Sequence, residues 1–250
     1  MKIIDFGLED YEPVLNRQQS LFDELIQKKI YRQPFEEYVL LGEHPDVITM
    51  GRRAKESNVL LSTEILNRKG IKVYHIGRGG DVTYHCPGQL IVYPILDLEK
   101  HSLGVKDYVN ILEETVIILL RNYGIKGERI EGATGVWIGK KTEKERKISA
   151  IGIKCSRYCT MHGLSLNVTS DLKGFSMINP CGFQDKGVTS IENEIKDHRK
   201  LGLKEESNFG KESIINKVKE DFLHIFFGLI FPFEEVLDFS KQLGSENEIV

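Results

Sequence analysis

The sequence has no long apolar run and no large excess of charge of one sign. Its longest apolar run, Val116 to Leu120, is far too short to cross a bilayer. Its 34 basic and 37 acidic side chains leave a net charge of −3, which gives no support for a general nucleic-acid binder. The first ten residues include acidic side chains and no apolar core of a signal peptide. We therefore expect a cytoplasmic protein with neither a nucleic acid nor a membrane as partner.

Cysteine is scarce, and its spacing does not indicate a metal site. The four cysteines are Cys86, Cys155, Cys159 and Cys181. Three residues separate Cys155 from Cys159, but no second pair or histidine follows at the spacing of a zinc finger. We expect no bound metal, and we expect reduced thiols, as in a cytosolic protein.

The known phosphate-binding motifs are also missing. The glycine-rich stretch 77–89 contains Gly77, Gly79 and Gly80, which do not fit G-x-G-x-x-G, and it lacks the G-K-[ST] end of a P-loop. The apolar run 90–95 that follows reads as a strand, so no helix N-terminus is available for a pyrophosphate. Adjacent glycines instead let the backbone approach a ligand closely, although a simple glycine turn between two strands fits the same residues.

The composition is typical of one soluble α/β domain of 250 residues. Apolar periodicity and terminal glycines predict helices over residues 9–29, 63–69, 105–123 and 211–227. Alternating runs predict strands at 71–76 and 90–95, a hairpin over 37–50 that turns at 42–46, and a hairpin between 133–139 and 147–154. The charged stretch from Glu192 to Lys211 is predicted to be a surface linker.

The stretch 147–183 contains the strongest candidates for catalytic residues. It reads as strand, turn and strand, followed by a turn-rich segment that places Cys181 between Pro180 and Gly182. A thiol on such a turn is open to approach, and Lys147, if brought near it, could act on its proton. A buried structural cysteine beside a surface lysine is the competing interpretation.

Five segments of the chain together resemble one protein family. They are EHPDVITMGRR (43–53), RGGDVTYHCPGQLIVYPILDL (78–98), KISAIGIK (147–154), TMHGLSLN (160–167) and INPCGF (178–183). In this order and spacing they resemble the octanoyltransferases of lipoate biosynthesis, also called lipoyl(octanoyl) transferases. The resemblance covers about residues 36–195 of one predicted catalytic domain, 1–250, and leaves out the N-terminal helix and the linker and helix of 196–250.

The resemblance implies a fold and an activity. The fold would be α/β (of the α+β kind), a mixed β-sheet flanked by helices, similar to the catalytic domain of biotin and lipoate protein ligases. The activity would be transfer of an octanoyl or lipoyl group from the phosphopantetheine of acyl carrier protein to a lysine of a lipoyl domain. The acceptors would be the lipoyl domains of 2-oxoacid dehydrogenases and the glycine cleavage H protein. No ATP, metal or other cofactor would be needed.

The resemblance also implies the residues of the site. Cys181 would be the nucleophile that holds the acyl group as a thioester, and Lys147 would adjust its ionisation. The residues implied to line the acyl site are Arg78, Gly79, Gly80, Asp81, Val82, Thr83, Tyr84, His85, Ala150, Ile151, Gly152, Gly163, Leu164 and Ser165.

The required chemistry agrees with a cysteine–lysine pair. An ordinary cysteine, with a pKa of about 8.5, is only a few per cent thiolate at pH 7. A neighbouring ammonium favours the thiolate, and a partly desolvated lysine could take the thiol proton and return it. We expect His85 and His162 to shape the site rather than catalyse, and His44 to be only a turn residue. The aromatic residues that could wall an acyl tunnel, or simply fill the core, are Tyr74, Tyr84, Tyr93 and Trp137.

Three other functions stay open at this point. An ATP-dependent lipoate or biotin protein ligase on the same fold would not need Cys181, and its transfer would require ATP and magnesium. A lipoyl amidotransferase would use a similar cysteine but would take the acyl group from an octanoylated lipoyl protein. A non-enzymatic acyl-protein or carrier-binding module would keep the glycine-rich loop and gain no covalent mass from a donor.

Overall fold

Two β-sheets and five α-helices make up the part of the chain that the computed structural model describes, residues 1–142, 144–179, 187–200 and 211–231. Along the larger sheet the strands are β1 (Lys2–Leu8), β2 (Tyr38–Glu43), β6 (Gln89–Ile95), β10 (Cys159–Asn167), β9 (Arg146–Ser156), β8 (Ala133–Ile138) and β7 (Glu128–Ile130). A short strand, β11 (Gly187–Val188), also pairs with β9. The β1–β2 and β11–β9 pairs are parallel and the others antiparallel, so the sheet is mixed.

The smaller sheet corrects one prediction. It consists of β4 (Lys72–His75), β3 (Val47–Met50) and β5 (Val82–His85) in that order. The predicted hairpin over 37–50 is wrong, because β2 lies between β1 and β6 in the larger sheet, whereas β3 lies between β4 and β5. Both edges of β2 are therefore occupied, and the turn after it carries the chain from one sheet to the other.

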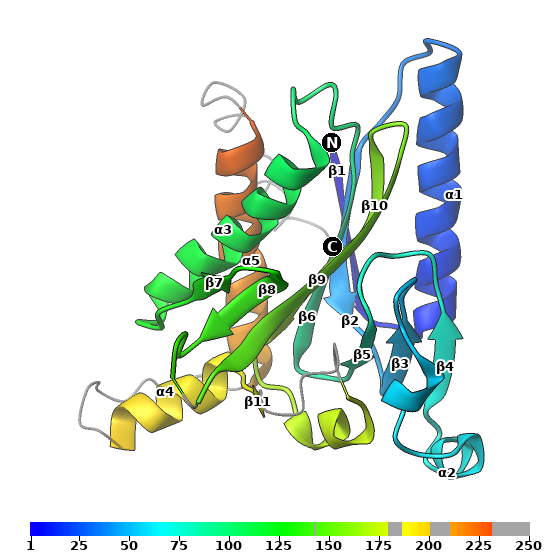
Figure 1. Cartoon of the computed structure of the whole chain (residues 1–250). Coiled ribbons are helices and arrows are strands. Elements are labelled where there is room, and N and C mark those ends of the chain that lie inside the picture. The colour runs from blue at the N-terminus through cyan, green and yellow to red at the C-terminus, as the bar shows by residue number, and fades with distance from the viewer. Residues whose placement is uncertain (143, 180–186, 201–210, 232–250) are drawn as a thin grey trace, which may run out of the picture.

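Helices cover both faces of the larger sheet (Figure 1). The helix α1 (Tyr11–Ile30) packs on one face, and α3 (Val105–Asn122) and α5 (Lys211–Ile230) pack on the other. A short helix, α2 (Thr63–Arg68), precedes β4, and the 3-10 turns η1 (Glu56–Asn58) and η2 (Leu172–Met177) lie near the smaller sheet. These helices confirm the four that periodicity predicts, and the whole confirms a mixed sheet flanked by helices. No helix in the described ranges is long and apolar enough to span a bilayer.

The alternation of side chains along the central strands divides the core into two layers. Leu40 and Ile91 pack with α1, whereas Leu41 and Val92, their neighbours along the same strands, pack with α3 and α5. Successive residues of a strand point to opposite faces, so a strand that is covered on both sides needs a continuous apolar run. Burial of a side chain such as Phe22 of α1 stabilises the packing by roughly 1.5–3 kcal/mol.

The predicted linker from Glu192 to Lys211 begins as a helix instead. The helix α4 (Ile191–Lys200) follows β11 directly, and residues 201–210 lie outside the described residues. Glu194 of α4 is 2% exposed and accepts two hydrogen bonds from Arg146 of β9, at 2.7 and 2.6 Å. One of the charges in this stretch thus forms an ion pair with a segment far away in sequence.

Candidate functional site

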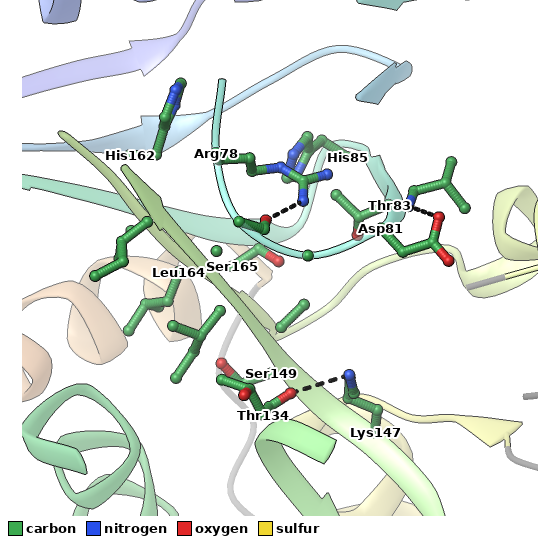
Figure 2. A pocket seen from close by; sticks show the side chains of 18 of the residues that line it. Arg78, Asp81, Thr83, His85, Thr134, Lys147, Ser149, His162, Leu164 and Ser165 are labelled. Carbon is green, nitrogen blue, oxygen red and sulfur yellow. Dashed lines mark hydrogen bonds between the residues drawn. The ribbon is translucent and has the colours of Figure 1, made fainter. Parts of the chain in front are cut away.

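A cavity of about 500 Å³ lies between the larger sheet, the β4–β5 loop and the start of α1. Its walls include consecutive residues of β9 from Lys147 to Ile153 and the β10 segment from His162 to Ser165. Figure 2 shows Lys147 and Thr134 at one end of the labelled side chains and Arg78, His85 and His162 at the other. The cavity is therefore elongated along the β9–β10 pair.

The glycine-rich loop lies directly against β9. The backbone N–H of Gly79 donates to the carbonyl of Ile153 at 2.8 Å, and Arg53 N–H donates to the carbonyl of Gly80 at 3.1 Å. A Cβ atom at Gly152 would come within 2.8 Å of the Gly79 carbonyl and 3.1 Å of Arg78 Cδ. Glycine at position 152 thus permits the glycine-rich loop and β9 to approach closely, although Gly79 and Gly152 lie 73 residues apart.

Arg78 fixes the loop from the other side. Its guanidinium is buried and donates to the carbonyl of Thr49 at 2.8 Å and to Thr49 Oγ1 at 3.0 Å. A third hydrogen bond, at 3.0 Å, runs to the carbonyl of Gly79 (Figure 2). The arginine therefore joins the small sheet to the glycine-rich loop while lining the cavity.

Lys147 lies near the edge of the cavity on β9. Its amine donates to the carbonyl of Thr134 at 3.1 Å and lies 4.6 Å from the centroid of the Trp137 ring. Both contacts suit a protonated amine, because a carbonyl oxygen and an aromatic face each attract a cation. The short strand β11 places Val188 opposite Lys147 in a parallel pair, so the chain rejoins the sheet beside this lysine seven residues after Cys181.

The other end of the cavity is aromatic and buried. Burial lowers the pKa of both His85 and His162 to about 3, so both imidazoles are neutral at physiological pH. Nδ1 of His85 donates to Gln89 Oε1 at 2.6 Å, which fixes its tautomer. Tyr11 of α1 and Tyr93 of β6 complete this end. Both histidines therefore contribute neutral side chains to this end of the cavity, and their role in shaping the site rather than in catalysis stays a prediction.

His44 is more than the turn residue that the sequence predicts. It is fully buried, and its Nδ1 donates to the carbonyl of Glu9 at 2.7 Å. Its Nε2 then accepts from the hydroxyl of Tyr93 at 3.1 Å, and burial lowers its pKa. The histidine thereby connects the segment before α1 to a tyrosine of the cavity, a contact that its local Glu-His-Pro context does not indicate.

Comparisons with known proteins agree with this architecture. The family model described as "Lipoyl protein ligase A/B catalytic domain" matches residues 10–220. The octanoyltransferase of Bacteroides thetaiotaomicron is 50% identical over 194 residues, which are 78% of this chain and 86% of the relative. The octanoyltransferase of Flavobacterium psychrophilum is 40% identical over 232 residues, 90% of this chain and 96% of the relative. This chain belongs to the octanoyltransferase family. It is accordingly an acyltransferase, and the family predicted from the motifs is confirmed.

Solved structures share the fold of this octanoyltransferase at low sequence identity. A bi-partite lipoate protein ligase from Thermoplasma acidophilum superposes with a TM-score of 0.56 at 16% identity, covering 91% of this chain and 82% of that one. A lipoate-protein ligase A bound with ATP gives a TM-score of 0.54 at 16% identity, with 89% and 94% covered. The predicted similarity to the ligase catalytic fold is confirmed.

The structure gathers most of the predicted site residues of this octanoyltransferase around one cavity. Lys147 and all the residues predicted to line the acyl site contribute to its walls, except Tyr84. Tyr84 is buried on the other side of β5, where its ring packs edge-on against Phe175 of η2. Cys181 lies outside the described residues. The roles of these residues in binding and catalysis stay predictions.

Two contributors to the cavity, Tyr11 and Ser149, are not among the predicted site residues. Tyr11 comes from α1, outside the segments that resemble the family, and its helical stripe shows only an apolar face. Ser149 is 1% exposed, lines the cavity and, among the described residues, has no hydrogen-bond partner for its hydroxyl. His162 also lines the cavity, and its Nδ1 is likewise buried and has no hydrogen-bond partner among the described residues. Buried polar atoms are nearly always paired, so both are available to a ligand or water in the cavity.

The three described cysteines of this octanoyltransferase are poor nucleophiles. Burial raises the pKa of Cys86 to about 12 and that of Cys159 to about 11, and it also raises the pKa of Cys155. The thiolate is the reactive form of cysteine, and its fraction at neutral pH falls tenfold with each unit that the pKa rises. None of these three thiols is therefore suited to carry an acyl group.

Proposed function

We propose that this octanoyltransferase moves an octanoyl group from acyl carrier protein to a lysine of a lipoyl domain, through a thioester on Cys181. The observation that supports this most directly is the position of Lys147, which shares one cavity with the glycine-rich loop and with both the Ala150–Gly152 and Gly163–Ser165 segments. The acyl chain would occupy the space between these segments. No ATP or metal takes part in the proposed reaction, because a thioester is already activated.

The first half-reaction loads the enzyme. Lys147 takes the thiol proton of Cys181, and the resulting thiolate attacks the carbonyl carbon of the octanoyl thioester on phosphopantetheine. The tetrahedral intermediate expels the phosphopantetheine thiolate, which takes the proton from the Lys147 ammonium. Cys181 is left as an octanoyl thioester, Lys147 is again neutral, and the carrier protein departs as a free thiol. The Thr134 carbonyl, which accepts a hydrogen bond, and the face of the Trp137 ring, through a cation–π contact, would hold the ammonium form between these steps.

The second half-reaction unloads the enzyme. The neutral amine of the acceptor lysine attacks the acyl carbon, and Lys147 accepts the proton that the new amide bond releases. Cys181 leaves as a thiolate beside the Lys147 ammonium, and return of the proton from Lys147 to the thiolate restores the thiol and neutral amine with which the cycle began. A double displacement of this kind suits two protein substrates, since the carrier protein and the lipoyl domain never occupy the site together.

The covalent intermediate can be tested by intact mass. The protein is mixed with octanoyl-acyl carrier protein in the absence of ATP, as wild type, Cys181→Ala and Cys86→Ala. We expect one octanoyl adduct on the wild type and on Cys86→Ala, none on Cys181→Ala, and loss of the adduct when a lipoyl domain is added. The Cys86 variant is the matched control, because burial raises the pKa of that thiol to about 12.

The same experiment separates the competing functions. Transfer that appears only after ATP and free octanoate are added would instead support a ligase. An adduct formed from octanoylated lipoyl protein but not from the carrier protein would support an amidotransferase. An unchanged mass under every condition, together with binding of the donor, would support a non-enzymatic module and contradict the proposal.

A further inference from the structure

The aromatic end of the cavity contains a side chain that the octanoyltransferase motifs do not include. We propose that Tyr11, the first residue of α1, closes the far end of the acyl cavity and sets the longest acyl chain that the enzyme accepts. The inference rests on the function proposed above, because it assumes that the acyl chain lies along β9 with its carbonyl at Lys147.

The position of Tyr11 supports a role as a stop. Its side chain is 4% exposed and contributes to the cavity wall together with His85, Tyr93 and His162, all of them buried. The Tyr11 and His85 rings are stacked, with centroids 6.2 Å apart and an interplanar angle of 9°. The carbonyl end of the cavity, by contrast, has an exposed wall residue, Thr134, whose carbonyl accepts a hydrogen bond from Lys147. The far end of an acyl chain would meet this cluster of buried rings, whereas the Trp137 ring lies beside Lys147 at the carbonyl end.

Two further rings, those of His44 and Tyr74, pack against the ring of Tyr11. His44 contacts it edge-on with centroids 5.2 Å apart, and Tyr74 of β4 contacts it at 5.1 Å. Tyr74 does not line the cavity and is only partly buried, and its hydroxyl donates to Glu12 near the surface at 3.4 Å. In the direction of Tyr74, one more ring thus separates Tyr11 from solvent. Shortening Tyr11 would lengthen the cavity in this direction.

The strand spacing gives the scale of the cavity. Lys147 and Ile153 are six residues apart on β9, which corresponds to about 20 Å at the usual rise of a strand. His162 pairs with Ile153 across the β9–β10 ladder, so the aromatic end lies at this level. The side chains of Lys147 and of the aromatic residues occupy the two ends of that span. The space that remains between them has room for an acyl chain of medium length.

Chain-length profiles of Tyr11 variants test the inference. The variants are Tyr11→Leu and Tyr11→Trp, with Tyr11→Phe as the control that keeps the ring, and Phe175→Ala as the control that enlarges another part of the wall. Hexanoyl-, octanoyl- and decanoyl-acyl carrier protein compete in one reaction, and the mass of the modified lipoyl domain gives the ratios of products. The Leu variant avoids the large cavity that alanine would leave in this buried position.

We expect the decanoyl-to-octanoyl ratio to rise about tenfold in Tyr11→Leu, because two additional methylene groups become buried. It should fall in Tyr11→Trp, and hexanoyl transfer should then gain relative to octanoyl. Tyr11→Phe and Phe175→Ala should keep the wild-type ratio. A wild-type ratio in both Tyr11→Leu and Tyr11→Trp, with octanoyl transfer intact, would overturn the role of Tyr11 and leave the proposed function standing. Absence of octanoyl transfer in the wild type would overturn both.

Discussion

The amine of Lys147 lies 4.6 Å from the centroid of the Trp137 ring, and these two residues are also direct partners in the β8–β9 ladder. The ring itself is fixed, because it is 2% exposed and its indole N–H donates to the carbonyl of Ala133 at 2.8 Å. The register of two neighbouring strands therefore decides where the lysine amine is held. A proton carrier in a transferase needs such a fixed position, since proton transfer requires hydrogen-bond distances.

Lys147→Arg distinguishes a proton carrier from a simple positive charge. Arginine keeps the charge but does not release a proton at accessible pH, so we expect kcat for octanoyl transfer to fall by about 10²–10⁴. The matched control is Lys154→Arg, since Lys154 lies on the same strand with its amine 4.9 Å from the Phe22 ring but does not line the cavity. An activity of Lys147→Arg within a few-fold of wild type would show that charge alone suffices.

The buried histidines should make the protein less stable in acid. The pKa of His162 is about 3 in the folded protein, against an ordinary value of 6.5. Below 6.5 the unfolded chain binds a proton that the folded protein does not, so the free energy of unfolding falls as the pH falls from 6.5 toward 3. This histidine should account for about 2 kcal/mol of the loss between neutral pH and pH 5.

Urea unfolding at the two pH values measures this loss. We choose His162→Asn because His162 has a φ of 59°, a conformation that asparagine tolerates better than most residues. The pH dependence should be weaker in this variant than in the wild type. His75→Gln is the control, since the His75 side chain is 65% exposed and should leave the dependence unchanged. Equal pH dependence in all three proteins would contradict the prediction.

Gly152→Ala should displace the glycine-rich loop. The new methyl group would lie 2.8 Å from the Gly79 carbonyl and 3.1 Å from Arg78 Cδ, and overpacking of this kind costs about 1–3 kcal/mol. We expect a matching loss in the free energy of unfolding and a loss of octanoyl transfer. Gly228→Ala in α5 is the opposite control, because nothing lies within 4 Å of its Cβ position and alanine favours a helix by about 0.5–1 kcal/mol. A Gly152→Ala protein with full activity would argue against the close loop contact.

The Arg146–Glu194 pair should be important for stability although α4 lies at the periphery (Figure 1). Glu194 accepts two hydrogen bonds from Arg146 and a third, at 2.6 Å, from Thr189. Glu194→Ala leaves a partly buried guanidinium without this partner, so we expect a loss of about 3–5 kcal/mol in denaturant unfolding. In the same helix, Lys196→Met breaks the more exposed pair with Glu192 and should cost no more than about 0.5 kcal/mol. Similar losses in the two variants would show that burial of Glu194 is unimportant.

Local patterns in the sequence were sufficient for four of the five described helices, all except α4, and for the family. Apolar spacing over 105–123, with Gly124 in a left-handed conformation at its end, predicts α3 because a helix stripe depends only on residues three and four apart. The motifs identify the family because their order and spacing are properties of the chain alone. The same motif segments contain most of the residues of the cavity wall, including Gly152, whose missing Cβ permits the contact with the Gly79 carbonyl.

Only the tertiary structure decided which segments meet. The strands β2 and β3 are separated by a short turn, yet they belong to different sheets because their partners come from elsewhere in the chain. In the same way, Glu194 finds Arg146, and His44 finds Tyr93, across 48 and 49 residues. Tyr11 reaches the cavity because α1 packs across β6 and β10. Local periodicity has no information on such contacts, because they depend on how whole elements pack against one another.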